Sequence, residues 1–298
     1  MNPMSMSRIM IGVCAYNEEN NIARLLQNLI SEQRIPKASK ILVVCSGCTD
    51  RTAQIVASFQ NRDPRIEPLV EGVRKGKSSA LNEIFRAART EADLLILVNA
   101  DALPEKGSIN RLISKFTTRD IGAVFAQPIP IKDYGSSCYG IARLIWRLHH
   151  IISVLDTPKL SGELCALRTA YLQEIPEKTA TDEPYIEGAI QKRHKKTLYA
   201  PEALVYIRCP TNVMDIIEQR KRIWIGHMQL RNATGYRVST SSFKNMLRAI
   251  FKLRRNESIY VLPGGFLEIV AYLKAKALFS KGAIPFAWEP IKSTKVSI

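Results

Sequence analysis

The first half of the chain alternates short apolar runs with segments whose apolar residues recur at helical spacing. Short apolar runs bounded by polar or turn residues predict buried strands, and a repeat of three to four residues predicts helices. The predicted strands are 10–15, 41–44, 66–69, 94–98 and 123–128. The predicted helices between them carry the apolar residues Ile22, Leu25, Leu26, Leu29, Ala53, Val56, Ala57, Ala80, Leu81, Ile84, Phe85 and Ala88. This alternation is typical of an α/β fold with a mostly parallel central sheet flanked by helices.

The pattern changes after Pro130 and becomes mainly helical. Apolar residues at helical spacing predict a long amphipathic helix over 139–155 and further helices over 184–193 and 213–231, with one strand over 203–208. We therefore expect an α/β domain over residues 1–235 and a basic, helical C-terminal appendage over 236–298.

Segment 258–279 carries an apolar stripe made of Phe266, Ile269, Val270, Leu273 and Ala277. We expect this stripe to dock on the core, and the alternative is a helix lying on a membrane surface, which Lys274 and Lys276 would suit. The chain contains no uninterrupted run of 18 uncharged apolar residues, so we expect no spanning helix.

The first eight residues lack the apolar centre of a signal peptide. We therefore expect a cytoplasmic protein, with possible peripheral placement on the inner face of the membrane as the alternative.

The positive charge of the chain is concentrated near its C-terminus. The formal net charge is +16, and residues 191–298 hold 20 Lys and Arg against 6 Asp and Glu. Such a surface can bind nucleic acid, anionic lipid or a phosphorylated substrate, or it can simply be solvated. No nucleic-acid recognition module is recognisable, so we expect no nucleic-acid partner.

Candidate chemistry lies at the ends of the predicted strands, where ligand sites of parallel sheets form. Asp101 closes the tripeptide that follows strand 94–98, where its carboxylate could meet a divalent cation and a diphosphate. Tyr16 and Glu18 follow the first strand, where a ring can pack on a nucleobase and a carboxylate can bond the ribose. The alternative for this segment is a helix N-cap formed by Asn17 or Asn20.

Two further loops carry polar residues. Asp50 or Thr49 would cap the helix after the second strand, and Lys77 precedes a helix beside small residues that allow a diphosphate to approach. The glycine-rich segment 72–79 is one residue short of a P-loop, which argues against a nucleoside triphosphatase. Cys45 and Cys48 form a CxxC pair that could be a zinc or redox site or a reduced, packed pair.

The order of these motifs resembles that of the family 2 inverting glycosyltransferases with the GT-A fold, over about residues 8–230. The matching motifs stand as Cys14-Ala15-Tyr16-Asn17-Glu18, Cys48-Thr49-Asp50-Arg51-Thr52, Gly76-Lys77-Ser78-Ser79-Ala80-Leu81-Asn82 and Asn99-Ala100-Asp101. The resemblance continues through Ser161-Gly162, Asp182-Glu183 and Gln219-Arg220-Lys221-Arg222-Ile223-Trp224. It implies a Rossmann-like GT-A sheet.

The resemblance also implies roles for the donor side of the site. Ala15, Tyr16 and Glu18 would hold the nucleoside, and Asp50 would order the loop beside it. The residues expected near the diphosphate are Lys77, Asn99, Ala100 and Arg222. Asp101 would coordinate Mg²⁺ or Mn²⁺ on the diphosphate. Asn99 replaces the first aspartate of the family's Asp-x-Asp tripeptide, so the metal has one negative partner fewer.

On the acceptor side, the resemblance places the catalytic base at Glu183, with Asp182 as the alternative. Asp182 could instead cap the helix that Pro184 opens. Gly162 and Trp224 would lie on the acceptor side, although Ile223 displaces Trp224 by one position from the family pattern. On a helix this displacement turns the ring by about 100°.

We therefore expect an inverting, metal-dependent glycosyltransferase that uses a nucleotide-sugar donor. The expected acceptor is lipid-linked or an oligosaccharide at the cytoplasmic face of the membrane, with peripheral contact to anionic lipid. The alternative is a non-catalytic sugar-nucleotide-binding homologue in which Asn99 reports a weakened metal site.

Overall fold

The structure is a computed structural model that describes residues 8–33, 35–36, 39–132, 138–155, 158–282, 284, 289 and 291–295. The expectation about a signal peptide concerns the first eight residues, of which only Arg8 lies within the described part.

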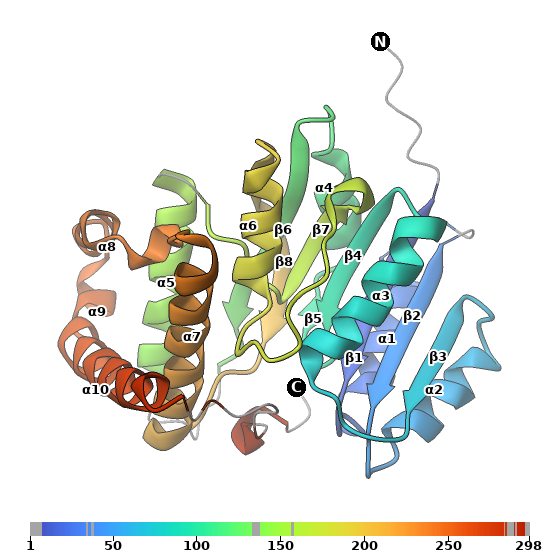
Figure 1. The fold of residues 1–298 in the computed structure, drawn as a ribbon, viewed down its shortest axis with the longest axis horizontal. Coiled ribbons are helices and arrows are strands. Elements are labelled where there is room, and N and C mark those ends of the chain that lie inside the picture. The colour runs from blue at the N-terminus through green and yellow to red at the C-terminus, as the bar shows by residue number, and fades with distance from the viewer. Residues whose placement is uncertain are drawn as a thin grey trace.

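The described strands form one eight-stranded sheet in the order β3-β2-β1-β4-β7-β6-β8-β5 (Figure 1). The strands are β1 (Ile9–Ala15), β2 (Lys40–Ser46), β3 (Ile66–Glu71), β4 (Leu94–Asn99), β5 (Leu103–Pro104), β6 (Ile121–Pro130), β7 (Leu164–Arg168) and β8 (Lys196–Ile207). Strands β1 to β4 pair in parallel, whereas β7 runs antiparallel to both β4 and β6. The α/β fold with a mostly parallel sheet is confirmed.

Helices cover both faces of this sheet. On one face, α1 (Ile22–Ser31), α2 (Thr52–Gln60) and α4 (Ser108–Ser114) bury their apolar residues against the strands. On the other face, α3 (Lys77–Glu91) and α6 (Glu183–Lys192) do the same (Figure 1). Burial of these continuous apolar runs from both sides is what a parallel sheet requires.

The C-terminal helices gather beside the β6 and β8 end of the sheet (Figure 1). They are α5 (Tyr139–Leu155), α7 (Val213–Thr234), α8 (Phe243–Ile250), α9 (Arg255–Ser258) and α10 (Val261–Ser280). Short 3₁₀ helices lie at Thr169–Tyr171, Ser239–Ser241 and Lys292–Thr294. The helices predicted over 139–155 and 213–231 are confirmed, the second with three more residues.

Three strands differ from the prediction. β5 and β7 were not predicted, and β8 begins at Lys196 rather than at residue 203. β5 has only two residues. β7 has five residues and lies in the sheet between β4 and β6, which are distant from it in the sequence. Neither strand therefore gives a clear hydrophobic pattern. The first half of β8 carries polar residues that pair with β6 across the sheet.

The docked stripe predicted on the last long helix is wrong except at Val270, which packs against buried residues of α5 and α7. Leu267, Ala271 and Ala275 are the buried residues of α10, and they pack with side chains of α5 and α7. Three predicted stripe residues, Phe266, Ile269 and Leu273, are instead exposed. Small and large apolar side chains alternate around α10, so periodicity alone did not say which side faces the core.

The expectation that no helix spans a membrane stays a prediction. In the described part of the chain, helix Arg255–Ser280 is long and apolar enough to cross a bilayer, judged by length and composition only. Only 17% of its most apolar window is buried. Its few charged residues interrupt the apolar run without lowering the mean hydropathy enough to exclude a span.

Candidate functional site

A cleft of about 960 Å³ opens at the carboxyl ends of β1 and β4 and is bordered by α7. Eleven of the thirteen residues to which the resemblance gives a role line it. They are Ala15, Tyr16, Glu18, Lys77, Asn99, Ala100, Asp101, Gly162, Asp182, Glu183 and Arg222. Asp50 and Trp224 are not among the lining residues. Adjacent strand ends meet here because Cys14 of β1 pairs with Asn99 of β4.

The turn after β1 is shaped by Asn17 rather than by a helix cap. Asn17 has a φ of 52°, and its side chain accepts a hydrogen bond from the Thr49 backbone N–H at 2.9 Å. Asparagine tolerates this left-handed conformation better than most residues. The N-cap of α1 is Asn21, and its side chain makes no capping bond, so the predicted caps Asn17 and Asn20 are wrong.

Asp50 ties the second loop to the first. Its carboxylate accepts hydrogen bonds from the backbone N–H of Thr52 at 2.9 Å and from that of Glu19 at 3.1 Å. Burial alone would raise the pKa of Asp50, but these hydrogen bonds outweigh it and lower the pKa. Asp50 therefore links the loops that follow β1 and β2. Its role in ordering the loop beside a nucleoside stays a prediction.

Tyr16 and Arg74 form a stacked pair in the lining of the cleft. The guanidinium carbon of Arg74 lies 3.9 Å from the centroid of the Tyr16 ring. A cation over an aromatic face is a favourable arrangement and presents a planar, positively charged group to the cleft. Arg74 lies in the glycine-rich segment 72–79, and nothing in the sequence indicated that it would meet Tyr16.

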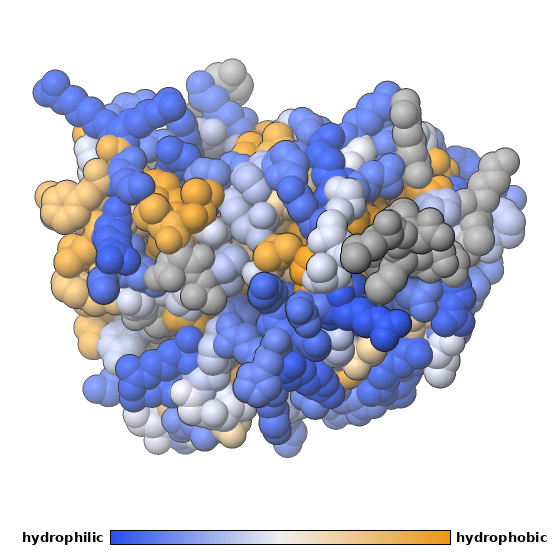
Figure 2. Space-filling model, turned by 90° about the horizontal axis from the view of Figure 1, so that it is seen from above, coloured by the Kyte–Doolittle hydropathy of each residue, from blue (hydrophilic) through white to orange (hydrophobic). Residues whose placement is uncertain are grey.

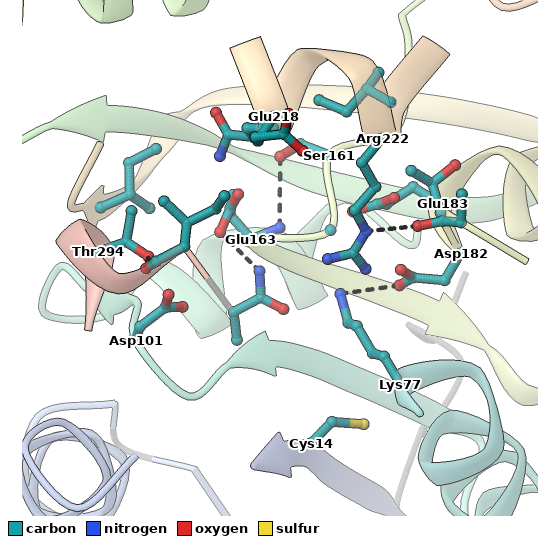
Figure 3. Close-up of a pocket in the computed structure, with 18 of the residues that line it drawn as sticks. Cys14, Lys77, Asp101, Ser161, Glu163, Asp182, Glu183, Glu218, Arg222 and Thr294 are labelled. Atoms are coloured by element: carbon teal, nitrogen blue, oxygen red, sulfur yellow. Dashed lines mark hydrogen bonds and ion pairs between the residues drawn. The ribbon is translucent and has the colours of Figure 1, made fainter. Parts of the chain in front are cut away.

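Lys77 forms an ion pair with Asp182, one of the two residues predicted as the catalytic base. Its Nζ lies 3.1 Å from Oδ2 of Asp182, and Figure 3 shows the two side chains pointing toward each other. Burial alone would lower the pKa of Lys77, but Asp182 and Glu183 outweigh it and hold the pKa above its usual value. Gly76, with a φ of 92°, turns the chain so that α3 can begin at Lys77.

Asp182 precedes α6 as its N-cap residue, but its side chain makes no capping bond and pairs with Lys77 instead. The alternative that Asp182 simply caps the helix is therefore wrong. Glu183 is the first residue of α6 and lies against Gly162. A Cβ placed on Gly162 would lie 2.5 Å from Oε1 of Glu183, so a larger residue here would displace the Glu183 side chain.

Arg222 of α7 reaches the same part of the cleft. Its Nε donates a hydrogen bond to the backbone oxygen of Ala180 at 2.7 Å, which fixes the guanidinium beside the segment that leads to Asp182. Arg222 lies within electrostatic range of both Lys77 and Arg74. The three cations can together face a diphosphate.

Asn99 and Glu163 form a hydrogen-bonded pair beside Asp101. Nδ2 of Asn99 donates to Oε2 of Glu163 at 2.8 Å (Figure 3). Burial and the charge of Asp101 raise the pKa of Glu163 to about 7, although the bond from Asn99 opposes this. The sequence analysis missed Glu163, whose only signal was its place directly after Gly162.

The C-terminal segment 291–295 also borders the cleft, and its residues were not predicted. Lys295 donates to a carboxylate oxygen of Glu18 and to the backbone oxygen of Tyr16, the latter at 3.2 Å. Burial and the charge of Asp101 raise the pKa of Glu18, and Lys295 opposes them. No local pattern could place Lys295 here, because 277 residues separate it from Glu18.

Trp224 lies against α10 instead of in the cleft. Its indole N–H donates to Oε1 of Glu268 at 2.9 Å, and its ring packs edge-on against Tyr272. Arg220 donates two further hydrogen bonds to Glu268, at 2.8 and 2.7 Å. In this structure Trp224 joins α7 to α10, a placement that does not favour the predicted contact with an acceptor.

The cysteine pair lies outside the cleft. Cys45 and Cys48 are free thiols, and Cys48 contacts the backbone oxygen of Ala15 at 3.5 Å. The described residues contain no group of three or more His, Cys, Asp or Glu side chains that could hold a metal ion.

The absence of such a group among the described residues limits how they could hold the expected Mg²⁺ or Mn²⁺. These ions accept one or two carboxylates when phosphate oxygens and waters complete the shell. Asp101 lines the cleft, and its charge raises the pKa of both Glu18 and Glu163, which are themselves buried or partly buried. The described residues therefore fit a cation shared by Asp101 and a bound diphosphate, and not one held by the protein alone.

Taken together, the cleft brings the cations Arg74, Lys77 and Arg222 close to several carboxylates, among them Asp101 and Glu183. Comparison with known proteins gives this arrangement a context. The chain is 29% identical over 119 residues to a beta-monoglucosyldiacylglycerol synthase of Synechocystis sp., covering 39% of this chain and 24% of that protein. It is 28% identical over 116 residues to an N-acetylglucosaminyltransferase of Rhizobium meliloti, covering 39% and 27%. The matched segments thus span less than a third of either relative.

Solved structures extend the likeness to nearly the whole chain. The mannosyltransferase PcManGT from Pyrobaculum calidifontis, solved with GDP-Man and Mn²⁺, superposes with a TM-score of 0.63 at 21% identity, over 94% of this chain and 81% of that one. TarS 1–349 of S. aureus, solved with UDP-GlcNAc, gives 0.52 at 15% identity, over 92% of both chains. At these identities the likeness shows a shared GT-A-like fold.

The comparison with protein families matches residues 10–169, which hold β1 to β7, to Glycosyl transferase family 2. This match covers more than half of the chain and includes the strand ends that carry Tyr16 and Asp101, and the start of α3 at Lys77. The chain therefore belongs to glycosyl transferase family 2.

Proposed function

We propose that this protein transfers a sugar from a nucleoside diphosphate sugar to an acceptor hydroxyl and inverts the configuration at the anomeric carbon. The observation that carries the proposal is that one cleft collects the groups that this reaction needs. Tyr16 stacks with Arg74, Lys77 pairs with Asp182, and Arg222 and Glu183 line the same cleft. These residue types suit a nucleoside, a diphosphate and an acceptor hydroxyl.

Glu183 is the better candidate for the base. Asp182 is buried and paired with Lys77 at 3.1 Å, so its carboxylate is already occupied as a counter-ion. Glu183 is partly exposed and lines the cleft beside Gly162. A carboxylate in this position can accept a proton from a hydroxyl within hydrogen-bond reach.

The transfer is then a single displacement. Glu183 takes the proton from the acceptor hydroxyl, the acceptor oxygen forms a bond to the anomeric carbon, and the bond from that carbon to the diphosphate oxygen breaks. The nucleoside diphosphate leaves with the electron pair of that bond. Lys77 and Arg222 stabilise its growing negative charge. Attack from the side opposite the leaving group inverts the anomeric centre.

Asp101 is the residue that would hold Mg²⁺ or Mn²⁺. Such an ion, when bound, stabilises the charge of the departing diphosphate. PcManGT was solved with Mn²⁺, which supports a divalent ion for this fold. The acceptor that we propose is lipid-linked or an oligosaccharide at the cytoplasmic face of the membrane, supported by the basic C-terminal part and by the glycolipid synthase among the relatives.

A panel of sugar nucleotides tests the activity and the donor together. Release of nucleoside diphosphate is measured for each donor with Mn²⁺, with Mg²⁺ and in EDTA. We expect one donor to support metal-dependent release, and Glu183→Gln and Asp101→Ala to lower its rate by more than a hundredfold with the fold intact. Glu177→Gln, another carboxylate at the rim of the cleft, is the matched control.

Two results would contradict the proposal. Binding of a nucleoside diphosphate without any release from the whole panel would favour the non-catalytic homologue. Equal rates for wild type, Glu183→Gln and Asp101→Ala would show that Glu183 is not the base and that Asp101 is not the metal ligand.

A further inference from the structure

The end of the molecule formed by α8, α9 and α10 exposes large apolar side chains. The C-terminal apolar face comprises Phe243, Leu247, Phe251, Ile259, Leu262, Phe266, Ile269 and Leu273, each between 38% and 86% exposed. Apolar side chains gather at the left of Figure 2, the side on which these helices lie in Figure 1. Contiguous exposed apolar patches mark interaction sites more often than chance.

Helix α10 contributes a regular stripe to this face. On α10 the exposed residues Leu262, Phe266, Ile269 and Leu273 follow the spacing of one helix side. The buried residues Leu267, Ala271 and Ala275 form the other side and pack toward α5 and α7. α10 is therefore apolar on both sides, and the fold covers only one of them.

The charges around this face are almost all positive. Segment 243–282 carries eight Lys and Arg, all of them exposed, namely Lys244, Arg248, Lys252, Arg254, Arg255, Lys274, Lys276 and Lys281. Its two acidic residues are already paired inside the molecule. Glu257 is buried beside Arg147, and Glu268 is bonded to Arg220. The exposed charge of the segment is thus entirely basic.

We propose that the C-terminal apolar face lies in the headgroup region of a bilayer that contains anionic lipid, with α10 parallel to the membrane plane. Apolar side chains that enter the acyl boundary and basic residues that meet lipid phosphates are the two components of interfacial binding. A purely protein partner would not require this excess of basic residues. The surface does not depend on the proposed catalytic activity, although it would bring a lipid-linked acceptor close to the cleft.

The packing of α10 argues against a spanning orientation. To cross the bilayer, α10 would leave α7 and break the bonds of Glu268 with Arg220 and Trp224. Glu268 would then lie in hydrocarbon with Lys274 and Lys276 on the same helix, which is costly for ionised groups. An interfacial position keeps these bonds and leaves both lysines at the polar boundary.

Vesicle flotation tests the proposal with the full chain. Vesicles of phosphatidylcholine alone are compared with vesicles that also contain phosphatidylglycerol. We expect wild type to float with the anionic vesicles and to be released by sodium carbonate at high pH. The combined variant Leu262→Ser, Phe266→Ser, Ile269→Ser should bind them more than tenfold more weakly. Val70→Ser, which alters an exposed valine on β3, is the matched control and should bind as wild type does.

Three results would overturn the proposal. Equal flotation of wild type and the combined variant would show that the face does not bind lipid. Wild type that resists carbonate and needs detergent would indicate a spanning helix. Wild type that is a dimer in solution, when the combined variant is a monomer, would show that a second copy covers the face. Donor turnover in solution should be equal for both proteins, which separates failure of docking from failure of the proposed activity.

Discussion

At the scale of single residues, the floor of the cleft depends on how Asn99, Asp101 and Glu163 share charge. An aspartate at position 99 would have faced Glu163 at hydrogen-bond distance, and two ionised carboxylates so close repel each other. With Asn99 the amide donates to Glu163 instead. Glu163 thus places a carboxylate beside position 99, where the family's tripeptide has its first aspartate.

Restoring the acid tests what this pair does for a metal. We expect Asn99→Asp to raise the affinity for Mn²⁺ by about tenfold, because a third carboxylate near Asp101 adds negative charge at close range. The measurement is calorimetric titration with Mn²⁺ in the presence of the preferred nucleoside diphosphate. Asn99→Ala is the control and should not gain affinity. Equal affinities for Asn99→Asp and wild type would mean that position 99 does not face the ion.

The raised pKa of Glu163 predicts a pH dependence of stability. Between the ordinary value of 4.5 and about 7, the folded protein keeps a proton that the unfolded chain has lost. Stability from this group is therefore fully present below pH 4.5 and is lost as the pH rises through about 7. In EDTA, Glu163→Gln should remove this loss of stability. The melting temperature of the variant should therefore rise relative to that of wild type as the pH increases toward 8.

Thermal unfolding at several pH values in EDTA measures the effect. Glu174→Gln, which alters a carboxylate that is 51% exposed, should follow the wild-type profile. Parallel profiles for Glu163→Gln and wild type would contradict the assignment.

At the scale of helices, the contact between α7 and α10 rests on Glu268. Its carboxylate accepts bonds from Arg220 and Trp224, which lie one helical turn apart on α7. The side chains of Arg220 and Glu268 are 20% and 31% exposed, so this pair is better shielded than a surface ion pair. α10 is therefore held by polar bonds at its middle as well as by its buried small residues.

We expect Glu268→Ala to lower the free energy of unfolding by about 1–3 kcal/mol, because it leaves two partly buried donors without their acceptor. Denaturant unfolding measures this change, and hydrogen exchange should show faster opening of α10 than of α3. The control is Glu202→Ala, which breaks the more exposed pair with Lys115 at a cost of about 0–1 kcal/mol. Equal effects of the two changes would show that Glu268 does not hold the helix.

At the scale of the whole molecule, the division into residues 1–235 and 236–298 remains a prediction that truncation can test. α10 covers Ile216, Ile217 and Ile225 of α7, which would face water in a chain that ends at Gly235. We expect this shorter chain to aggregate or to melt well below the full chain, because exposed core residues lose their burial energy. Thermal unfolding with light scattering measures this. Cooperative unfolding of residues 1–235 near the full-chain melting temperature would instead support two independent domains.

The strand ends show how far local pattern reaches. Apolar runs ending in polar residues predicted the strands that hold Tyr16 and Asp101, because a buried parallel strand must be apolar throughout and must end where it meets solvent. The family motifs, which are short and lie on these ends, supplied the candidate residues. Most of them line one cleft, because parallel strands bring their carboxyl ends to one edge of the sheet.

The amino-acid sequence by itself determined the α/β fold, the edge of the sheet that carries the site and eleven of the residues that line the cleft. Only the tertiary structure decided that Asp182 pairs with Lys77, that Trp224 turns to α10, and that Glu163 and Lys295 enter the site. It also decided which side of α10 is covered. Periodicity places a residue on a side of its own helix or strand, but what that side meets depends on segments distant in the chain.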